Sequence, residues 1–487
     1  MLVMLLSTLN QTVVATALPK IASELNGLSQ LSWLATAYLL TAAVTTPLYG
    51  KISDLFGRKK IFQIAISIFL VGSILCGLSQ DATQLIVSRA IQGIGAGGLM
   101  ALVQAIIGDI IPPRERGRYM GYLAGTFGAA SVLGPLVGGF LTDSLSWRWI
   151  FLINIPLCAA ALWAVTTRLH LPIDKRPRHI DYTGALLLLA GTTSLLLAAV
   201  WAGSTYAWGS QIIISLLVSA GALGTLFVFW ERRAREPIIP IRLFRNSIFS
   251  ASVVISMLAG IAMFAAILYI PVYQQIVRNM TPTKSGLFML PLVIGLVGAS
   301  VGVGRLISKY GRYKIFPLLG TLILALGLWL FSHVSVNTSE WTLGIWMFII
   351  GAGLGSFMQV TMVSIQNSVD HRDLGTATAS LLFFRGLGAS LGGAIFGALL
   401  IGRFSHHLNQ LGLQSGQLDI DIHKIQGGAS QIQSLPPAVA SNVLEAFTRS
   451  FQDVFLVVTP FALLAFVVAL FLREVPLRTT RHGAADN

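Results

Sequence analysis

Gly50-Lys-Ile-Ser-Asp54-Leu-Phe-Gly57-Arg58-Lys59-Lys60 separates two long apolar stretches of the chain, and a second loop repeats its layout. The second copy is Gly304-Arg-Leu-Ile-Ser-Lys-Tyr-Gly311-Arg312-Tyr-Lys314. In both copies a glycine is followed seven residues later by Gly-Arg and then by a lysine. Glycine permits the backbone of a tight turn, and basic residues favour an anionic lipid surface. The repeat therefore predicts two similar halves, each with a basic turn between two membrane-crossing helices.

Composition supports a membrane protein. Of 487 residues, 54% are hydrophobic and only 11% are charged, against about 25% charged in an average soluble domain. The mean hydropathy is +0.75. One membrane span needs about 20 mainly apolar residues. We therefore expect an all-α membrane protein of about fourteen spans, at roughly 1–19, 32–50, 61–79, 83–109, 119–141, 147–167, 183–202, 211–230, 248–272, 285–307, 314–332, 341–366, 376–401 and 452–472.

The positions of lysine and arginine predict the orientation. With the N-terminus inside, 24 of the 33 basic residues fall on the cytoplasmic side and seven on the outer side. The remaining two, Arg89 and Arg385, lie within spans. Cytoplasmic loops of membrane proteins carry such an excess, so the net charge of +14 indicates topology and no nucleic-acid partner. We expect a multi-pass inner-membrane protein of a bacterium, with both termini cytoplasmic.

The repeat also predicts the domain organisation. Its two copies are eight predicted spans apart, which suggests two six-helix bundles with two extra helices between them; parallel repeats are typical of secondary transporters. We expect bundles at 1–168 and 247–475, linker helices at 169–246 and a cytoplasmic tail at 476–487. Met1 opens directly into an apolar run without a cleavable signal peptide. We expect a cytoplasmic segment to precede it.

A long outer loop is expected at 402–450 because this stretch is rich in Gln, Ser and Gly. Five residues with metal-binding side chains fall in it: His406, His407, Asp419, Asp421 and His423. Their spacing matches no strong metal motif. We therefore expect a solvated loop without a metal site.

Further motifs lie within the predicted spans: Leu9-Asn10-Gln11-Thr-Val-Val14 with Ala17-Leu-Pro19, Arg89-Ala-Ile-Gln92-Gly93-Ile-Gly95, Gly134-Pro135-Leu-Val-Gly138-Gly139, Trp147-Arg-Trp-Ile-Phe-Leu-Ile-Asn154-Ile-Pro156, Gln366-Asn-Ser-Val369 and Gly375-Thr-Ala-Thr-Ala-Ser380. Together with the Gly50 loop they resemble the signature of the major facilitator superfamily, and more narrowly its 14-span drug:proton antiporters. This resemblance covers nearly the whole chain.

The resemblance implies two six-helix bundles around a central cavity and alternating access by rocking of one bundle against the other. It implies proton-driven export of small amphipathic or cationic compounds by a monomer surrounded by lipid. It also implies a gating role for residues of the loop and of the glycine-proline helix: Gly50, Asp54, Gly57, Arg58, Lys59, Asp109, Gly134, Pro135, Gly138 and Gly139.

Asn10 departs from the family pattern, in which an acidic residue carries the coupling proton. A carboxyl group at membrane depth can bind and release protons near neutral pH, whereas Asn has no titratable proton. Arg89 corresponds to the arginine that tunes this proton site. The chain is thus expected to be a coupling-defective Asp-to-Asn form. Alternatively, it couples through another group or works as a facilitator.

Residues of the substrate cavity are predicted from polarity and aromaticity. A polar or charged group at membrane depth should face protein or water, and aromatic rings can stack on flat drugs. The candidates are Gln11, Trp33, Tyr38, Gln92, Phe264, Tyr269, Tyr273, Gln359, Gln366, Phe383 and Arg385.

Other functions are disfavoured by the sequence. Gly93–Gly98 matches the nucleotide-binding pattern G-x-G-x-x-G, but it lies inside a predicted membrane helix with no strand before it. The chain has no P-loop and no convergent catalytic group, so we expect neither an ATP-driven pump nor an enzyme, and no cofactor. Two alternatives stay open: an exporter of a natural product or lipid, and a non-transporting membrane receptor or scaffold.

Overall fold

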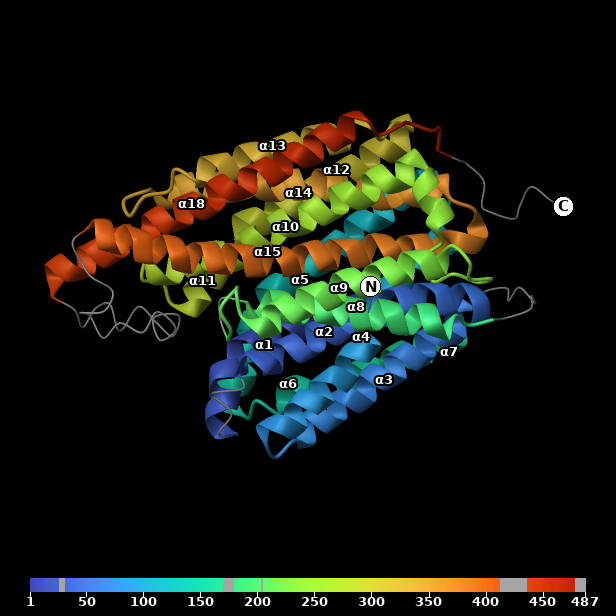
Figure 1. The fold of residues 1–487 in the computed structure, drawn as a ribbon, viewed down its shortest axis with the longest axis horizontal. Coiled ribbons are helices and arrows are strands. Elements are labelled where there is room, and N and C mark those ends of the chain that lie inside the picture. Colours follow the sequence, from blue (N-terminus) through green and yellow to red (C-terminus); the bar gives the residue numbers. More distant parts are fainter. Residues whose placement is uncertain (26–30, 170–178, 203–204, 412–435, 478–487) are drawn as a thin grey trace.

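The structure is a computed structural model that describes residues 1–25, 31–169, 179–202, 205–411 and 436–477. The described residues are helical except for short connections and a single isolated bridge between Ala202 and Tyr206. The predicted all-α fold is confirmed. Figure 1 shows two groups of long helices, with the N-terminal group below and the C-terminal group above.

The N-terminal group contains seven described helices whose starts follow ordinary capping chemistry. Gly57 turns the chain into α3 with a φ of 92°. Asp81 caps α4 by accepting a hydrogen bond from the Gln84 amide, and Pro113 is the first residue of α5. The helices are α1 (Leu2–Glu24), α2 (Leu31–Phe56), α3 (Arg58–Leu78), α4 (Ala82–Ile110), α5 (Pro113–Ser144), α6 (Trp149–Leu152) and α7 (Asn154–Arg168).

Two further helices, α8 (Tyr182–Trp201) and α9 (Gln211–Glu231), follow as the predicted linker pair. They pack on one another, and α8 also contacts α2 of the first group and α15 of the second. In Figure 1 they lie across the seam between the two groups.

The C-terminal group repeats the long-helix pattern of the first. Gly311 ends α12 with a φ of 73°, so both repeated loops turn at a glycine in the left-handed region. The elements are η2 (Ile241–Arg245), α10 (Ser247–Ile276), α11 (Pro282–Phe288), α12 (Leu290–Tyr310), α13 (Ile315–Phe331), α14 (Glu340–Ser368), η3 (His371–Asp373), α15 (Leu374–Gln410) and α18 (Pro437–Leu470).

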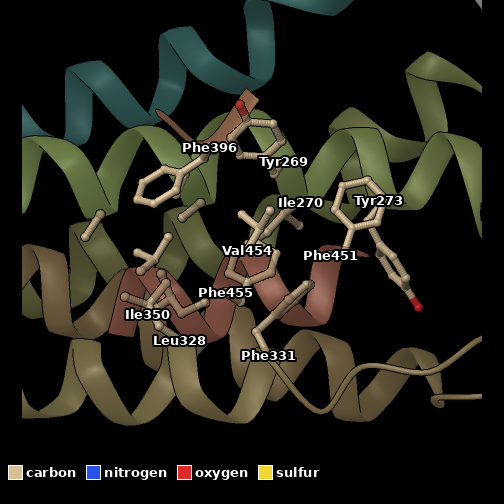
Figure 2. Close-up of a cluster of buried hydrophobic side chains, with 14 of the residues drawn as sticks. Tyr269, Ile270, Tyr273, Leu328, Phe331, Ile350, Phe396, Phe451, Val454 and Phe455 are labelled. Atoms are coloured by element: carbon tan, nitrogen blue, oxygen red, sulfur yellow. The ribbon is translucent and has the colours of Figure 1, made fainter. Parts of the chain in front are cut away.

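The core of the C-terminal group is aromatic. Figure 2 shows Tyr273, Phe331, Phe451 and Phe455 side by side among buried aliphatic side chains. Tyr273 makes edge-on ring contacts with Phe331 at 6.0 Å and with Phe451 at 5.8 Å between ring centres. Such pairs add roughly 0.5–1.5 kcal/mol beyond the burial of their area. They fix α10, α13 and α18 to one another.

Each of the fourteen predicted spans coincides with one helix or with two consecutive helices. Among the described helices, ten are long and apolar enough to cross a membrane, and two shorter apolar segments lie at Leu2–Gln11 and Ile315–Phe331. Membrane-spanning character is thus confirmed, while the count of fourteen stays a prediction.

The predicted loop at 402–450 was too long. Helix α15 continues to Gln410 and α18 begins at Pro437. The reason is packing: Phe404 stacks on Phe447 with ring centres 4.0 Å apart, and Leu408 and Val443 are also buried. Polar residues on the opposite helix faces masked this apolar stripe in the sequence. Asp419, Asp421 and His423 lie outside the described residues, and no group able to hold a metal occurs among those described.

Candidate functional site

Asp54 joins the two bundles at the end of the molecule where the repeated loops lie, called here the loop end. Its carboxylate accepts hydrogen bonds from the Gly375 amide at 3.1 Å, the Thr376 amide at 2.7 Å and the Thr376 hydroxyl at 2.8 Å. These are the first residues of α15, whose N-terminus favours negative charge. Arg58 Nη1 lies 2.8 Å from the same carboxylate. Asp54 thus both caps a helix of the other bundle and pairs with an arginine of its own bundle.

Arg58 extends this network to a second acid. Its guanidinium also pairs with Asp109 at the end of α4 and donates to the Ser53 hydroxyl at 3.1 Å. The side chains of Asp54, Arg58 and Asp109 are at most 10% exposed. Two carboxylates and one guanidinium leave one negative charge, which the N-terminus of α15 offsets. Four helices are thereby locked together: α2, α3, α4 and α15.

Gly50 permits the close approach that this network needs. A Cβ at Gly50 would meet the Ala379 Cβ and would come within 2.7 Å of the Gly375 carbonyl oxygen on α15. Any larger residue would therefore separate α2 from α15.

The second repeat makes an equivalent contact between α12 and α5. A Cβ at Gly304 would meet the Gly117 carbonyl oxygen and come within 2.6 Å of its carbonyl carbon. The loop itself is held by Glu474, which accepts a hydrogen bond from the Tyr313 amide at 2.8 Å. Ser308 stands where the first copy has Asp54, so the charge network is built on one half only.

Two lysines tie the first loop to its surroundings. Lys59 donates to the Thr166 carbonyl at 2.8 Å on α7. Lys51 pairs at 2.6 Å with Glu236, in the segment after α9. Sequence reasoning missed Glu236, because nothing in the chain marks it as a partner 185 residues away.

The structure brings three predicted residues, Asn10, Gln92 and Tyr38, together around a fourth, Arg89. Its Nη1 donates to Asn10 Oδ1 at 2.8 Å and to Gln92 Oε1 at 2.7 Å, and its guanidinium carbon lies 4.2 Å from the centre of the Tyr38 ring. Its Nε also donates to the Leu34 carbonyl at 3.3 Å. All four predicted side chains are buried, Arg89 at 3% exposure.

Arg385 is the other arginine that lies within a predicted span, on α15 of the C-terminal group. Its Nη2 donates to the Met358 carbonyl on α14 at 3.2 Å. The side chains of Arg385 and Gln359 are half-buried. Gln366 lies elsewhere, bridging α14 to α4 by donating to the Gln104 carbonyl at 3.1 Å.

The other predicted cavity residues are engaged in helix packing, except Gln11, which is half-buried on α1. The Trp33 and Trp201 ring centres are 5.6 Å apart, and Phe264 lies against Gly393. The Tyr269 hydroxyl donates to the Gly393 carbonyl, and the Tyr273 hydroxyl donates to the Ser335 carbonyl. Phe383 packs with Leu188 and Phe227 of the linker helices. Their role in a substrate cavity stays a prediction.

The glycine-proline segment lies in the second half of α5. Gly134 and Gly138 are buried, Gly139 is half-buried, and the side chain of Pro135 lies outside the described residues. A Cβ at Gly139 would meet nothing within 4 Å. Its proposed sealing role is not tested by these contacts.

A groove of about 580 Å³ lies between the two bundles. It is lined by α1, α5 and α12, mainly through Leu2, Leu5, Gly121, Gly125, Val297 and Val301. Gly121 and Gly125 lie on the α5 face that packs on α12. The groove is an apolar opening beside the interface that Gly117 and Gly304 close.

Comparison with known proteins agrees with this architecture. Residues 1–393 match the Major Facilitator Superfamily model. An uncharacterized MFS-type transporter of Mycobacterium tuberculosis is 41% identical over 485 residues, covering 99% of this chain and 70% of the relative. Multidrug resistance protein 3 of Bacillus subtilis is 32% identical over 98% of this chain and 94% of the relative.

A solved structure, that of the proton:xylose symporter XylE, superimposes with a TM-score of 0.64 at 14% identity. It covers 99% of this chain and 96% of XylE. At that identity the match supports the fold alone. The family model and the relatives show that the chain is a membrane transporter of the major facilitator superfamily, of the multidrug efflux type.

Proposed function

We propose that this protein is an efflux transporter of small amphipathic molecules that works by alternating access, built as a proton-driven secondary transporter but carrying a coupling-defective Asn at position 10. The Asp54 network carries the proposal, because it joins the N-terminus of α15 in one bundle to α2, α3 and α4 in the other. It acts as a latch that holds the loop end closed. Both termini and the loop end face the cytoplasm of a bacterial cell, in keeping with the positive-inside rule.

The latch is suited to a cycle because its two interfaces are narrow. Gly50 meets α15, and Gly304 meets Gly117, through backbone rather than interlocked side chains. Small residues let helices approach closely and separate without repacking a core. Opening the loop end breaks the Asp54 contacts to Gly375 and Thr376, and closing restores them.

Proton coupling is assigned to position 10 with Arg89 as its neighbour. A membrane potential of about 100 mV contributes roughly 2.3 kcal/mol per proton, and one pH unit adds about 1.4 kcal/mol. One proton could then sustain a substrate gradient of roughly a few hundred-fold. Asn10 has no titratable proton, so in this chain proton movement is not coupled to export at position 10.

We expect Asn10→Asp to restore proton-driven export. The new carboxylate would replace the amide oxygen that now accepts from Arg89 at 2.8 Å, and a proton would compete with the guanidinium for it. The measurement is efflux of an amphipathic dye from reconstituted vesicles under a pH gradient. The Asp form should concentrate the dye, and the unaltered chain should only equilibrate it.

Gln11→Glu is the matched control for this experiment. It adds a carboxylate one residue away, on a side chain that is half-buried and has no hydrogen bond to Arg89 in the described structure. It should gain no coupling. If the unaltered chain and the Asp form respond equally to the pH gradient, position 10 is not the coupling site.

A second candidate, export of a lipid or a lipophilic natural product, is favoured by the apolar groove between α1, α5 and α12. An acyl chain could enter between the bundles there. Competition of dye efflux by single-chain lipids would support this candidate, and indifference to them would exclude it.

A further inference from the structure

Among the described residues, the charged side chains that lie well inside the membrane-spanning helices are all positive. Outside α18, every acidic residue of the described chain lies within two residues of a helix end or in a connection. The two in α18, Glu445 and Asp453, precede or begin its predicted span and pair with Arg449 and with His407. Arg89 and Arg385, by contrast, lie well inside α4 and α15. Ionised groups there are costly unless they are compensated or functional.

Arg385 lies near the middle of the membrane. It is ten residues along α15 from Gly375, or about 15 Å at 1.5 Å per residue, in a hydrocarbon layer of about 30 Å. Its Nη2 donates to a backbone carbonyl, and its buried Nε has no hydrogen-bond partner among the described residues. A Cβ at the neighbouring Gly386 would meet nothing within 4 Å. The guanidinium therefore has no negatively charged partner among the described residues, and its Nε donor is unused.

Arg89 provides a second uncompensated cation in the other bundle. The partners described for it are the Asn10 and Gln92 amides, the Leu34 carbonyl and the Tyr38 and Phe151 rings, all of them neutral. The buried Nδ2 of Asn10 also lacks a partner within the described part of the chain. The unpartnered atoms of these two residues, Nδ2 of Asn10 and Nε of Arg385, are both donors. A donor in a low-dielectric site is satisfied by an acceptor, and best by a negatively charged one.

We propose that the molecule exported is an amphipathic organic anion, whose carboxylate, sulfonate or phosphate group binds Arg385. This rests on the proposed export function and names its substrate class. An anion would compensate the buried guanidinium, whereas a lipophilic cation would meet repulsion from both arginines without a carboxylate to bind it. The assignment departs from the cationic substrates expected from the sequence.

Arg89 also favours anions over cations, although it does not contact the anionic group that binds Arg385. It is twenty residues along α4 from Asp109, about 30 Å, so it lies some 15 Å further from the loop end than Arg385. The two arginines thus place positive charge at two different depths of the molecule. With Asn in place of an acid at position 10, nothing described beside Arg89 cancels its charge.

The test is counterflow exchange in proteoliposomes, which needs no proton gradient and so is independent of Asn10. The probes are carboxyfluorescein and a rhodamine methyl ester, an anion and a cation on the same xanthene core. We expect saturable exchange of the anion and little exchange of the cation. Arg385→Gln should raise the KM for carboxyfluorescein about ten- to hundred-fold, the effect of losing a charge-assisted contact.

Arg385→Lys keeps the positive charge but loses the planar guanidinium geometry that can bind an anion through two hydrogen bonds. Its KM for carboxyfluorescein should be much closer to that of the unaltered chain than the KM of Arg385→Gln is, and its kcat should stay near that of the unaltered chain. This rescue separates substrate binding from a structural role, and it remains informative if the Gln variant does not elute as a folded protein. Arg403→Gln is the matched control: the same substitution on α15, at a half-exposed arginine near Asp453. It should leave the KM for carboxyfluorescein unchanged.

Exchange of the cation without the anion would overturn the anion assignment while leaving the transport function standing. So would an unchanged KM in folded Arg385→Gln. Exchange of neither dye would contradict the proposed function itself. Replacing chloride by gluconate separates the two sources of a bound anion: an unchanged KM supports the organic anion, whereas dependence on chloride through Arg385 would show an inorganic ion there and overturn the proposal.

Discussion

Asp54→Asn is expected to lower transport by about two orders of magnitude and to leave the loop end open. The substitution removes the charge that pairs with Arg58 and faces the N-terminus of α15. Breaking a buried ion pair by removing one partner costs about 3–5 kcal/mol. Arg58 lies in the same bundle as Asp54, so only the loss of the Asp54 contacts to Gly375 and Thr376, which exist only when the bundles meet, falls on the closed state. Hydrogen bonds to a charged acceptor contribute about 1.5–3 kcal/mol each, and losing them shifts a two-state population by roughly a hundred-fold.

The measurement combines dye exchange with a distance between the bundles. Spin labels at Arg118 on α5 and Arg305 on α12, both exposed and close to the Gly117–Gly304 contact, report the separation of the loop end. Asp54→Asn should lengthen this distance. Asp81→Asn is the matched control, because Asp81 also caps a helix but does so at the exposed start of α4. Unchanged exchange and distance in Asp54→Asn would remove the latch from the mechanism.

The turns of this fold were predictable because they depend on local sequence. A second glycine seven residues after the first in each repeat predicts a tight turn, and Gly57 and Gly311 do have positive φ angles. The helices were predictable for the same reason, since long apolar runs are sufficient in lipid. The end of α15 was not: Phe404 and Leu408 are buried only because α18 returns beside them.

The partners of Asp54 could not be found from sequence. Gly375 and Thr376 lie more than 320 residues away, and no periodicity connects the two segments. The meeting of Gly117 with Gly304 is of the same kind. Both contacts belong to tertiary structure. In this chain, resemblance to a family could suggest them, but composition and spacing could not.

The predicted cavity-lining residues stay a prediction, because aromatic residues on a membrane helix are ambiguous. In a soluble protein the apolar face of a helix points to the core, but in a membrane protein the lipid-facing side is apolar as well. Tyr273 and Phe383 therefore looked like drug-stacking residues although they pack within the C-terminal core and against the linker helices. Arg385 was the better candidate, because a charged group at membrane depth cannot face lipid without a large cost.

Gly304→Ala is expected to abolish most transport by preventing closure of the loop end. The added methyl group would meet the Gly117 carbonyl oxygen and lie 2.6 Å from its carbonyl carbon. Backbone atoms have no rotamer that relieves such a clash, so α5 and α12 must separate. Overpacking of this kind costs about 1–3 kcal/mol, which would lower the closed population by roughly ten- to hundred-fold. Dye exchange should fall accordingly, and the distance between labels at Arg118 and Arg305 should increase.

Gly302→Ala is the control that isolates the contact. It makes the same chemical change two residues away on the same helix, where an added Cβ meets nothing within 4 Å, so transport and distance should stay unchanged. Gly50→Ala should reproduce the Gly304 effect from the other interface, because its methyl group would lie 2.7 Å from the Gly375 carbonyl oxygen. The two repeats would then be working parts of one gate. If Gly304→Ala behaves as Gly302→Ala does, the close approach of α5 to α12 is a packing feature that the transport cycle does not need.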